Sequence, residues 1–349
     1  MQFGGNPDHC TLGGCSAGAS SVVLQLTAYG GKDENLFHAA VAESQAFPPI
    51  RDVAEMQWTY DALLQKTGCK DLVCMQQLDA VTFQSAVRRF KPPFPGGRGP
   101  PLFFWNPTLD FEFIKDYTYN EIKAGHFVDV PTLFGDTTNE GLGFTPTNIN
   151  TLQRAEQFIT DQFPNLNESD YKRIRSVWHG PDNPNYDPRW RNTASDIYGH
   201  IRYICPGLNI SHAYAASGTA PSWKYRWNVG KALHVEELNS IWHNGSDAAS
   251  VFMQSYVVSF IRSYNPNRYA ISIFPNSRAK YDTYFVSHLL FRNMLTLYPH
   301  LKVSSQVPPA FGKRGYLSDL GHVRWWKWET HATFQQQHSR NGGCATRRA

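Results

Sequence analysis

The sequence predicts an α/β fold in which a mostly parallel central sheet is flanked by helices. A short apolar run at 10–12 leads through a glycine-containing turn into a helical stretch at 19–26. Residues 128–135 form a second run, which reads as a buried strand ending at Gly135, and the aromatic-rich run 221–227 reads as a third strand. Helical patterns separate these runs, and strands that alternate with helices typically form parallel sheets. The alternation therefore sets the fold class.

The turn after the first run is the pentapeptide G-C-S-A-G at 14–18, which fits the pattern G-x-S-x-G. Strand, sharp turn and helix are the context of a nucleophile elbow, in which the serine has a strained backbone. We expect glycine at Gly14 and Gly18 because larger side chains would collide with the neighbouring strand and helix. Ser16 would then expose its hydroxyl at a helix N-terminus. There the helix dipole and the Ala17 N–H can stabilise an oxyanion.

Apolar spacing predicts most of the other elements. In the stretch 53–66, the residues Met56, Tyr60 and Leu63 recur at helical intervals, so a helix is expected there. Proline and glycine in K-P-P-F-P-G-G-R-G-P-P predict a loop at 91–101. The remaining expected elements are an extended stretch at 102–112 and helices at 72–78, 81–90, 151–163, 168–178, 192–203 and 248–264.

Composition excludes several classes of protein. With 349 residues, 41% of them hydrophobic and 18% charged, the chain is typical of a globular protein with a sizeable core. The net charge is only +4 and the basic residues are scattered, so no nucleic-acid partner is indicated. No apolar run approaches the length of a membrane span. No His or Cys spacing suits a metal, and the glycines at 13–18 lack the lysine of a phosphate loop, so no metal or cofactor is expected.

Three blocks occur in order along the chain: F-G-G-N-P at 3–7, S-A-G-A at 16–19 and L-F-H-A-A-V-A-E-S at 36–44. With these blocks the sequence resembles the type-B carboxylesterase family of the α/β-hydrolase superfamily, which includes cholinesterases and fungal lipases. The resemblance continues to about Asn267. It implies the α/β-hydrolase fold and the hydrolysis of carboxylic esters.

The resemblance also implies how the chain is divided. Residues 1–268 match the C-terminal portion of a carboxylesterase-type domain, and 269–349 form a poorly matching, partly helical tail with an unstructured end at 335–349. In the resembled family, several strands, a helix and an oxyanion loop beginning with His-Gly-Gly precede the F-G-G-N-P block. We therefore expect an N-terminally incomplete domain in which the Ala17 N–H is one oxyanion donor and the His-Gly-Gly loop is absent.

A serine nucleophile needs a base, and the base needs an acid to orient it. In α/β-hydrolases the acid and then the histidine follow the serine along the chain. The segment G-D-T-T-N-E-G at 135–141 lies just beyond the strand expected at 128–135. Its E-G pair resembles the acid-bearing pair of the family, which assigns the acid to Glu140. Asp136 is the competing carboxylate, although its place in the matching block does not fit.

The segment K-A-L-H-V-E-E-L at 231–238 resembles the family segment that carries the catalytic histidine. In the family an apolar residue precedes this histidine and a glutamate lies three positions beyond it. The resemblance therefore assigns the base to His234, and His243 is the alternative. The family usually has glycine where this chain has Val235, and valine disfavours a positive φ.

Further features are implied around this triad. Ser44 matches a family serine that supports the acid. The family has a paired-cysteine loop at the place of Cys69 and Cys74, for which a short disulfide is favoured over two free thiols. Three N-x-S/T sequons are candidate glycosylation sites and agree with secretion, although Met1 is not followed by a signal peptide. They are at Asn167, Asn209 and Asn244.

These observations predict a serine carboxylic-ester hydrolase that acts through an acyl-enzyme on Ser16, with His234 as base and Glu140 as acid. Its substrate would be a small-molecule or lipid ester. The alternative is a catalytically impaired fragment, or a non-enzymatic, cholinesterase-like binding protein. The sequence predicts neither the preferred acyl chain nor the oligomeric state.

Overall fold

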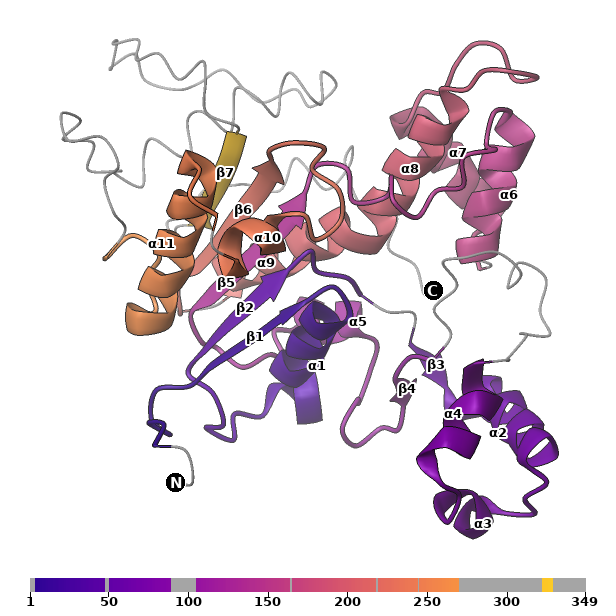
Figure 1. Ribbon diagram of the computed structural model, residues 1–349, viewed down its shortest axis with the longest axis horizontal. Coiled ribbons are helices and arrows are strands. Elements are labelled where there is room, and N and C mark those ends of the chain that lie inside the picture. Colours follow the sequence, from indigo (N-terminus) through magenta and orange to yellow (C-terminus); the bar gives the residue numbers. More distant parts are fainter. Residues whose placement is uncertain are drawn as a thin grey trace.

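The computed structural model describes residues 4–47, 50–88, 105–163, 165–217, 219–243, 245–269 and 322–328. Among these residues, five strands form one sheet in the order β1-β2-β5-β6-β7 (Figure 1). They are β1 (Thr11–Cys15), β2 (Ala39–Glu43), β5 (Thr132–Thr137), β6 (Ser222–Asn228) and β7 (His322–Trp328). The first four strands pair in parallel, and β7 pairs antiparallel with β6. The mostly parallel sheet expected from the sequence is confirmed.

Helices cover both faces of this sheet (Figure 1). On one face, α1 (Ala17–Gly31), α5 (Thr118–Ala124) and α9 (Cys205–Ser217) pack against Phe134 and its neighbours. On the other face, α10 (Glu237–Trp242) and α11 (Ala248–Ser263) pack against Leu133. Alternate strand residues point to opposite faces, so a strand covered on both sides is apolar throughout. This explains why the residues from Ala39 to Ala42 in β2 are all apolar and all buried.

A group of helices lies on the side toward which the strand arrowheads point in Figure 1. It contains α6 (Leu152–Gln162), α7 (Glu168–Val177) and α8 (Trp190–Gly199), and α8 runs directly into the π-helix η1 (His200–Ile204) and then into α9. Phe158, Ile174 and Tyr198 join these helices in one buried cluster. The carboxyl ends of the parallel strands therefore face a helical layer, and ligand sites of α/β sheets lie at this edge.

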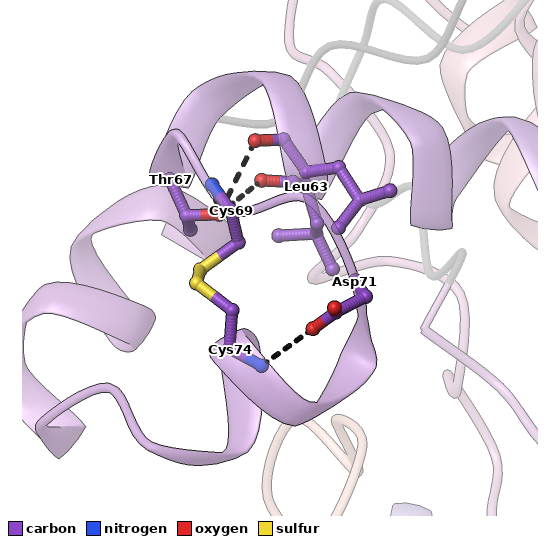
Figure 2. The surroundings of a disulfide bond; sticks show 6 residues. Leu63, Thr67, Cys69, Asp71 and Cys74 are labelled. Carbon is purple, nitrogen blue, oxygen red and sulfur yellow. Dashed lines mark hydrogen bonds between the residues drawn. A yellow bond between two sulfur atoms is a disulfide. The ribbon is translucent and has the colours of Figure 1, made fainter.

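The Cys69–Cys74 disulfide lies in a smaller unit with its own apolar cluster. The unit is built from β3 (Arg51–Asp52), α2 (Val53–Thr67), α3 (Leu72–Gln76), α4 (Ala80–Arg88) and β4 (Thr108–Leu109). Asp52 and Glu55 form a capping box at the start of α2. Figure 2 shows that Asp71 caps α3 by accepting the Cys74 N–H, with Oδ1 2.8 Å from the nitrogen. The disulfide thus joins the end of α2 to the capped start of α3, and the expected pairing is confirmed.

Several element boundaries differ from those predicted. The strand expected at 128–135 begins instead at Thr132, because Pro131 cannot donate to a sheet. The stretch 102–112 contains only the two-residue β4 among its described residues. The helix expected to end at Tyr203 continues instead through the π-helix η1 into α9, so Pro206 lies within a continuous helical run. The loop expected at 91–101 and the unstructured end expected at 335–349 lie outside the described residues.

Candidate active site

Ser16 lies at the turn between β1 and α1, at the carboxyl end of its strand. Its backbone has a φ of 53° and a ψ of −115°, a conformation that non-glycine residues rarely adopt. The turn is fixed because the Ser16 N–H donates to the Glu43 carbonyl at 2.9 Å, and the Ser16 carbonyl accepts the Ser20 N–H at 3.0 Å. The strained backbone expected of a nucleophile elbow is therefore present.

The two glycines of the pentapeptide have different surroundings. A Cβ at Gly14 would lie 2.5 Å from the backbone carbonyl of Gly18, a distance that no side chain tolerates. A Cβ at Gly18 would meet no described atom within 4 Å. The expected collision thus applies to Gly14, but the expectation for Gly18 is wrong among the described residues.

This difference gives a matched pair of variants. Gly14→Ala should force the turn apart at a cost of about 1–3 kcal/mol, and it should slow the reaction of Ser16 with an active-site serine probe. Gly18→Ala adds the same methyl group to open space and should leave the labelling rate within about twofold of wild type. Rates of fluorophosphonate labelling, measured on both variants, check the expectation. Equal rates would show that Gly14 has no steric role.

The structure brings the three residues of the expected triad together. Ser16 Oγ lies 2.7 Å from Nε2 of His234, and Nδ1 of His234 lies 2.6 Å from Oε2 of Glu140. Glu140 is 1% exposed, so its carboxylate is removed from solvent, while Ser16 is only partly buried. The Nδ1 hydrogen bond fixes the histidine tautomer in which Nε2 can accept the serine proton.

Glu140 is held by its own loop. Its second oxygen, Oε1, accepts the backbone N–H of Thr137 at 2.7 Å. The loop in turn docks on the segment that carries the base, because Asn139 N–H donates to the Ala232 carbonyl at 2.8 Å and its Nδ2 donates to the Lys231 carbonyl at 2.8 Å. Asp136, the competing carboxylate, points elsewhere and pairs with Lys224. The acid and base segments are thus joined by direct hydrogen bonds.

The base segment has an unusual backbone at Val235, whose φ is 58°. Ser44 Oγ holds this residue by accepting its N–H at 3.1 Å, and it donates in turn to Glu237 Oε1 at 3.2 Å. The expected role of Ser44 needs correction, since its side-chain hydrogen bonds go to Val235 and Glu237 and not to Glu140. The valine that replaces the family's usual glycine nevertheless takes the positive φ, held by this contact.

Two buried carboxyl groups lie near Ser16, and their burial was not expected from the sequence. Glu237 and Glu43 are 0% and 3% exposed. Burial raises the pKa of Glu237 well above its ordinary value, and the charges of Glu140 and Glu43 raise it further. Burial also raises the pKa of Glu43 to about 7, although Trp242 Nε1–H donates to it at 3.3 Å. Glu237 is the glutamate three positions after His234 that the resemblance points to.

Aromatic rings pack against the base. The ring centroid of Tyr203 lies 4.4 Å from that of His234, and that of Phe144 lies 5.0 Å from it. Tyr203 belongs to the π-helix η1, a distortion that is frequent at functional sites. The two rings leave the His234 side chain 11% exposed. They therefore shield the imidazole from bulk water.

The remaining described residues singled out in the sequence lie in helices or at their ends. Ala17 is exposed at the start of α1, where the first backbone N–H groups have no acceptor within the helix. His243 ends α10, and its carbonyl accepts from Gln254 at 3.0 Å. Asn167 is an exposed N-cap of α7, Asn209 is half-buried within α9, and Asn244 lies outside the described residues.

Neither a metal-binding cluster nor a membrane-spanning helix occurs in the part of the chain that the structure describes. It contains no group of three or more His, Cys, Asp or Glu residues that could hold a metal ion. Within the same ranges, no helix has both the length and the apolar character needed to cross a membrane.

The chain matches a known protein family. The family model described as the carboxylesterase family matches residues 1–288, which is most of the chain. The chain belongs to the carboxylesterase family. The crystal structure of EstA from Aspergillus niger is similar with a TM-score of 0.66 and 31% sequence identity, over 78% of this chain and 58% of that one. The α/β-hydrolase fold expected from the sequence is therefore confirmed.

Curated relatives of this carboxylesterase-family chain are fungal. Secreted lipase 4 of Gibberella zeae is 25% identical over 304 residues, which cover 76% of this chain and 52% of the relative. Carboxylesterase patB of Penicillium expansum is 24% identical over 76% of this chain and 48% of its own length. Lipase 2 of Geotrichum candidum is 28% identical over 51% of this chain and 34% of its own. The chain thus spans about half the length of the curated relatives it matches, or less.

Proposed function

We propose that the protein hydrolyses carboxylic esters through an acyl-enzyme on Ser16. The observation that supports this most is the continuous series of short contacts from Ser16 Oγ to His234 (2.7 Å) and from His234 to Glu140 (2.6 Å). A serine hydroxyl is a weak nucleophile until a neighbouring base removes its proton, and this geometry supplies such a base.

In the first half of the reaction, Ser16 Oγ attacks the ester carbonyl carbon while His234 Nε2 takes the hydroxyl proton. The imidazolium that forms is stabilised by the Glu140 carboxylate, which accepts the Nδ1–H. The carbonyl oxygen becomes an oxyanion, and we expect the Ala17 N–H at the start of α1 to donate to it. The intermediate collapses as His234 returns the proton to the leaving alcohol.

In the second half, a water molecule gives its proton to His234 and attacks the acyl carbon. Collapse of this second intermediate breaks the bond to Ser16 Oγ, which regains its proton from the histidine, and the carboxylic acid leaves. Because Phe144 and Tyr203 shield one part of the imidazole, the proton transfers take place in a poorly hydrated site. Electrostatic stabilisation is stronger in such surroundings.

The substrate class follows from the relatives and the site together. The relatives are named lipases and carboxylesterases, and two of those matched are named secreted lipases. The aromatic rings of Phe144 and Tyr203 beside the base suit an uncharged acyl or alcohol group. We therefore propose a neutral small-molecule or lipid ester as substrate, and secretion as the destination.

An active-site probe tests the proposal directly. A fluorophosphonate reagent should label the wild-type protein covalently at Ser16, as identified by mass spectrometry of the modified peptide, and should not label Ser16→Ala. Ser21→Ala is the matched control, because this serine lies exposed on α1, and its labelling should equal that of wild type. Equal labelling of wild type and Ser16→Ala would overturn the assignment of the nucleophile.

A further inference from the structure

A buried ion pair lies directly beside the loop that carries Glu140. Lys224 Nζ of β6 is 2.5 Å from Asp136 Oδ2 of β5, and both side chains are 2% exposed. The register places Asp136 opposite Arg226, so Lys224 reaches diagonally across the two strands. Gly207 of α9 leaves room for this reach, since a Cβ there would lie 2.8 Å from the lysine nitrogen.

Burying an ion pair of this kind in the protein interior costs free energy. Removing two charges from water can cost more than their attraction returns, and apolar residues of similar volume are often equally or more stable in the same place. The Lys224–Asp136 pair therefore has no obvious advantage for stability alone. Its position relative to the catalytic residues offers a different reason for its presence.

The pair is connected to the nucleophile by consecutive contacts. The peptide that follows Asp136 contains the Thr137 N–H, which donates to Glu140 Oε1 at 2.7 Å. The other oxygen of Glu140 contacts His234, and His234 contacts Ser16. The side chain of Asp136 thus anchors the residue immediately before the N–H group that orients the acid.

A second cation holds the far side of the same peptide. Arg226 Nε lies 3.9 Å from Asp136 Oδ1, and its Nη2 donates to the Thr138 carbonyl at 3.4 Å. Two basic residues of β6 therefore fix the segment on both sides of Thr137. This segment is also where β5 ends, so beyond it the regular strand pairing no longer constrains the backbone.

We propose that Lys224 and Asp136 are positioning residues for the triad: their ion pair directs the Thr137 N–H and thereby aims Glu140 at His234. The inference rests on the proposed function, because it deepens the account of the same site. It also gives a role to the carboxylate that competed with Glu140 in the sequence.

The test separates positioning from stability by removing one charge and then both. Lys224→Met leaves a buried carboxylate unpaired and should be less stable than wild type. Lys224→Met/Asp136→Leu should recover the wild-type unfolding midpoint, since an apolar pair is tolerated there. Its kcat for a p-nitrophenyl ester should nevertheless stay about 10- to 100-fold below wild type with KM unchanged, because a misplaced catalytic group slows chemistry by such factors.

A matched control removes another buried polar pair from the same two strands. Thr132 Oγ1 donates to Ser222 Oγ at 2.8 Å on the same face of the sheet, at the opposite ends of β5 and β6. Thr132→Val/Ser222→Ala should change stability and leave kcat within about twofold of wild type, because it does not touch the acid loop.

A second measurement does not depend on turnover. The Nδ1 proton of His234, held by Glu140, should give a proton NMR signal downfield of the amide region, identified by its loss in His234→Ala. The signal should be present in wild type and in the Thr132/Ser222 control, and moved or lost in Lys224→Met/Asp136→Leu. If wild type fails to hydrolyse esters, the proposed function fails, while this signal still decides the positioning role.

The outcome that overturns the inference is a double variant with wild-type kcat and an unmoved His234 signal. If the double variant does not fold, the isosteric Asp136→Asn is measured in the same two assays. It should lower kcat and move the signal, and wild-type values in both would equally overturn the inference.

Discussion

Replacement of Glu140 by glutamine should lower kcat for ester hydrolysis by about 10⁴-fold while the fold is retained. Glutamine keeps the shape of the side chain, and its carbonyl can still accept the Thr137 N–H that now lies 2.7 Å from Glu140 Oε1. Its NH₂ group, however, would then face His234 Nδ1 and donate to it. The histidine would take the tautomer with a proton on Nε2, which cannot accept the proton of Ser16.

The chain offers a control for this experiment. Glu121 is another buried glutamate, 5% exposed, that contacts a histidine, with Oε2 3.0 Å from His126 Nδ1. Glu121→Gln makes the same chemical change on α5 and should leave kcat within about twofold of wild type. Steady-state kinetics with a chromogenic ester measure both variants. A Glu140→Gln protein with more than a tenth of wild-type kcat would contradict the role of Glu140 as the acid.

Replacement of Glu43 by glutamine should make the stability of the protein less dependent on pH. The pKa of Glu43 is raised from the ordinary 4.5 to about 7, chiefly because the carboxyl is buried. The native state therefore keeps a proton between these two pH values that the unfolded chain has already lost. Consequently, the stability that protonated Glu43 contributes is fully present below pH 4.5 and is lost as the pH rises from 4.5 to about 7.

Glutamine cannot ionise, so the variant should gain stability relative to wild type as the pH rises. The difference in the free energy of unfolding between the variant and wild type should be near zero below pH 4.5 and should grow up to pH 7. Above pH 7 it should stay level at about 3 kcal/mol, since each pKa unit corresponds to about 1.4 kcal/mol. The Trp242 N–H keeps an acceptor in the glutamine carbonyl. Urea unfolding at a series of pH values measures the difference, and the exposed Glu112→Gln serves as control. A difference in the free energy of unfolding that does not change with pH would contradict the expectation.

The sequence predicted which residues lie together at the candidate site better than it predicted the elements around them. Ser16, Glu140 and His234 could be found because each belongs to a recognisable block and the blocks follow one another in the order that the fold requires. The disulfide was predictable for the same reason. Short motifs of reactive residues can be recognised in a sequence even where the ends of the strands cannot be predicted.

The residues that contact the triad were harder to predict from the sequence. Lys224 stands in an aromatic-rich strand, and its sequence gives no sign that the charge is buried, because its partner depends on the register of β5 with β6. Tyr203 is placed by a π-helix between α8 and α9, a distortion that apolar spacing does not reveal. Lys224 and Tyr203 were missed because each acts through a contact with a segment that is distant along the chain.

The distances along the chain between the triad residues have a consequence for how the protein folds. His234 is 94 residues from Glu140 and 218 residues from Ser16, although all three side chains meet. Contacts between such distant residues form late, because large loops must close before any of them is gained. A nascent chain can therefore build α1 and its turn long before Ser16 meets a base. Reactivity toward a serine probe would then mark the completion of folding, and partly folded chains would carry an inert serine.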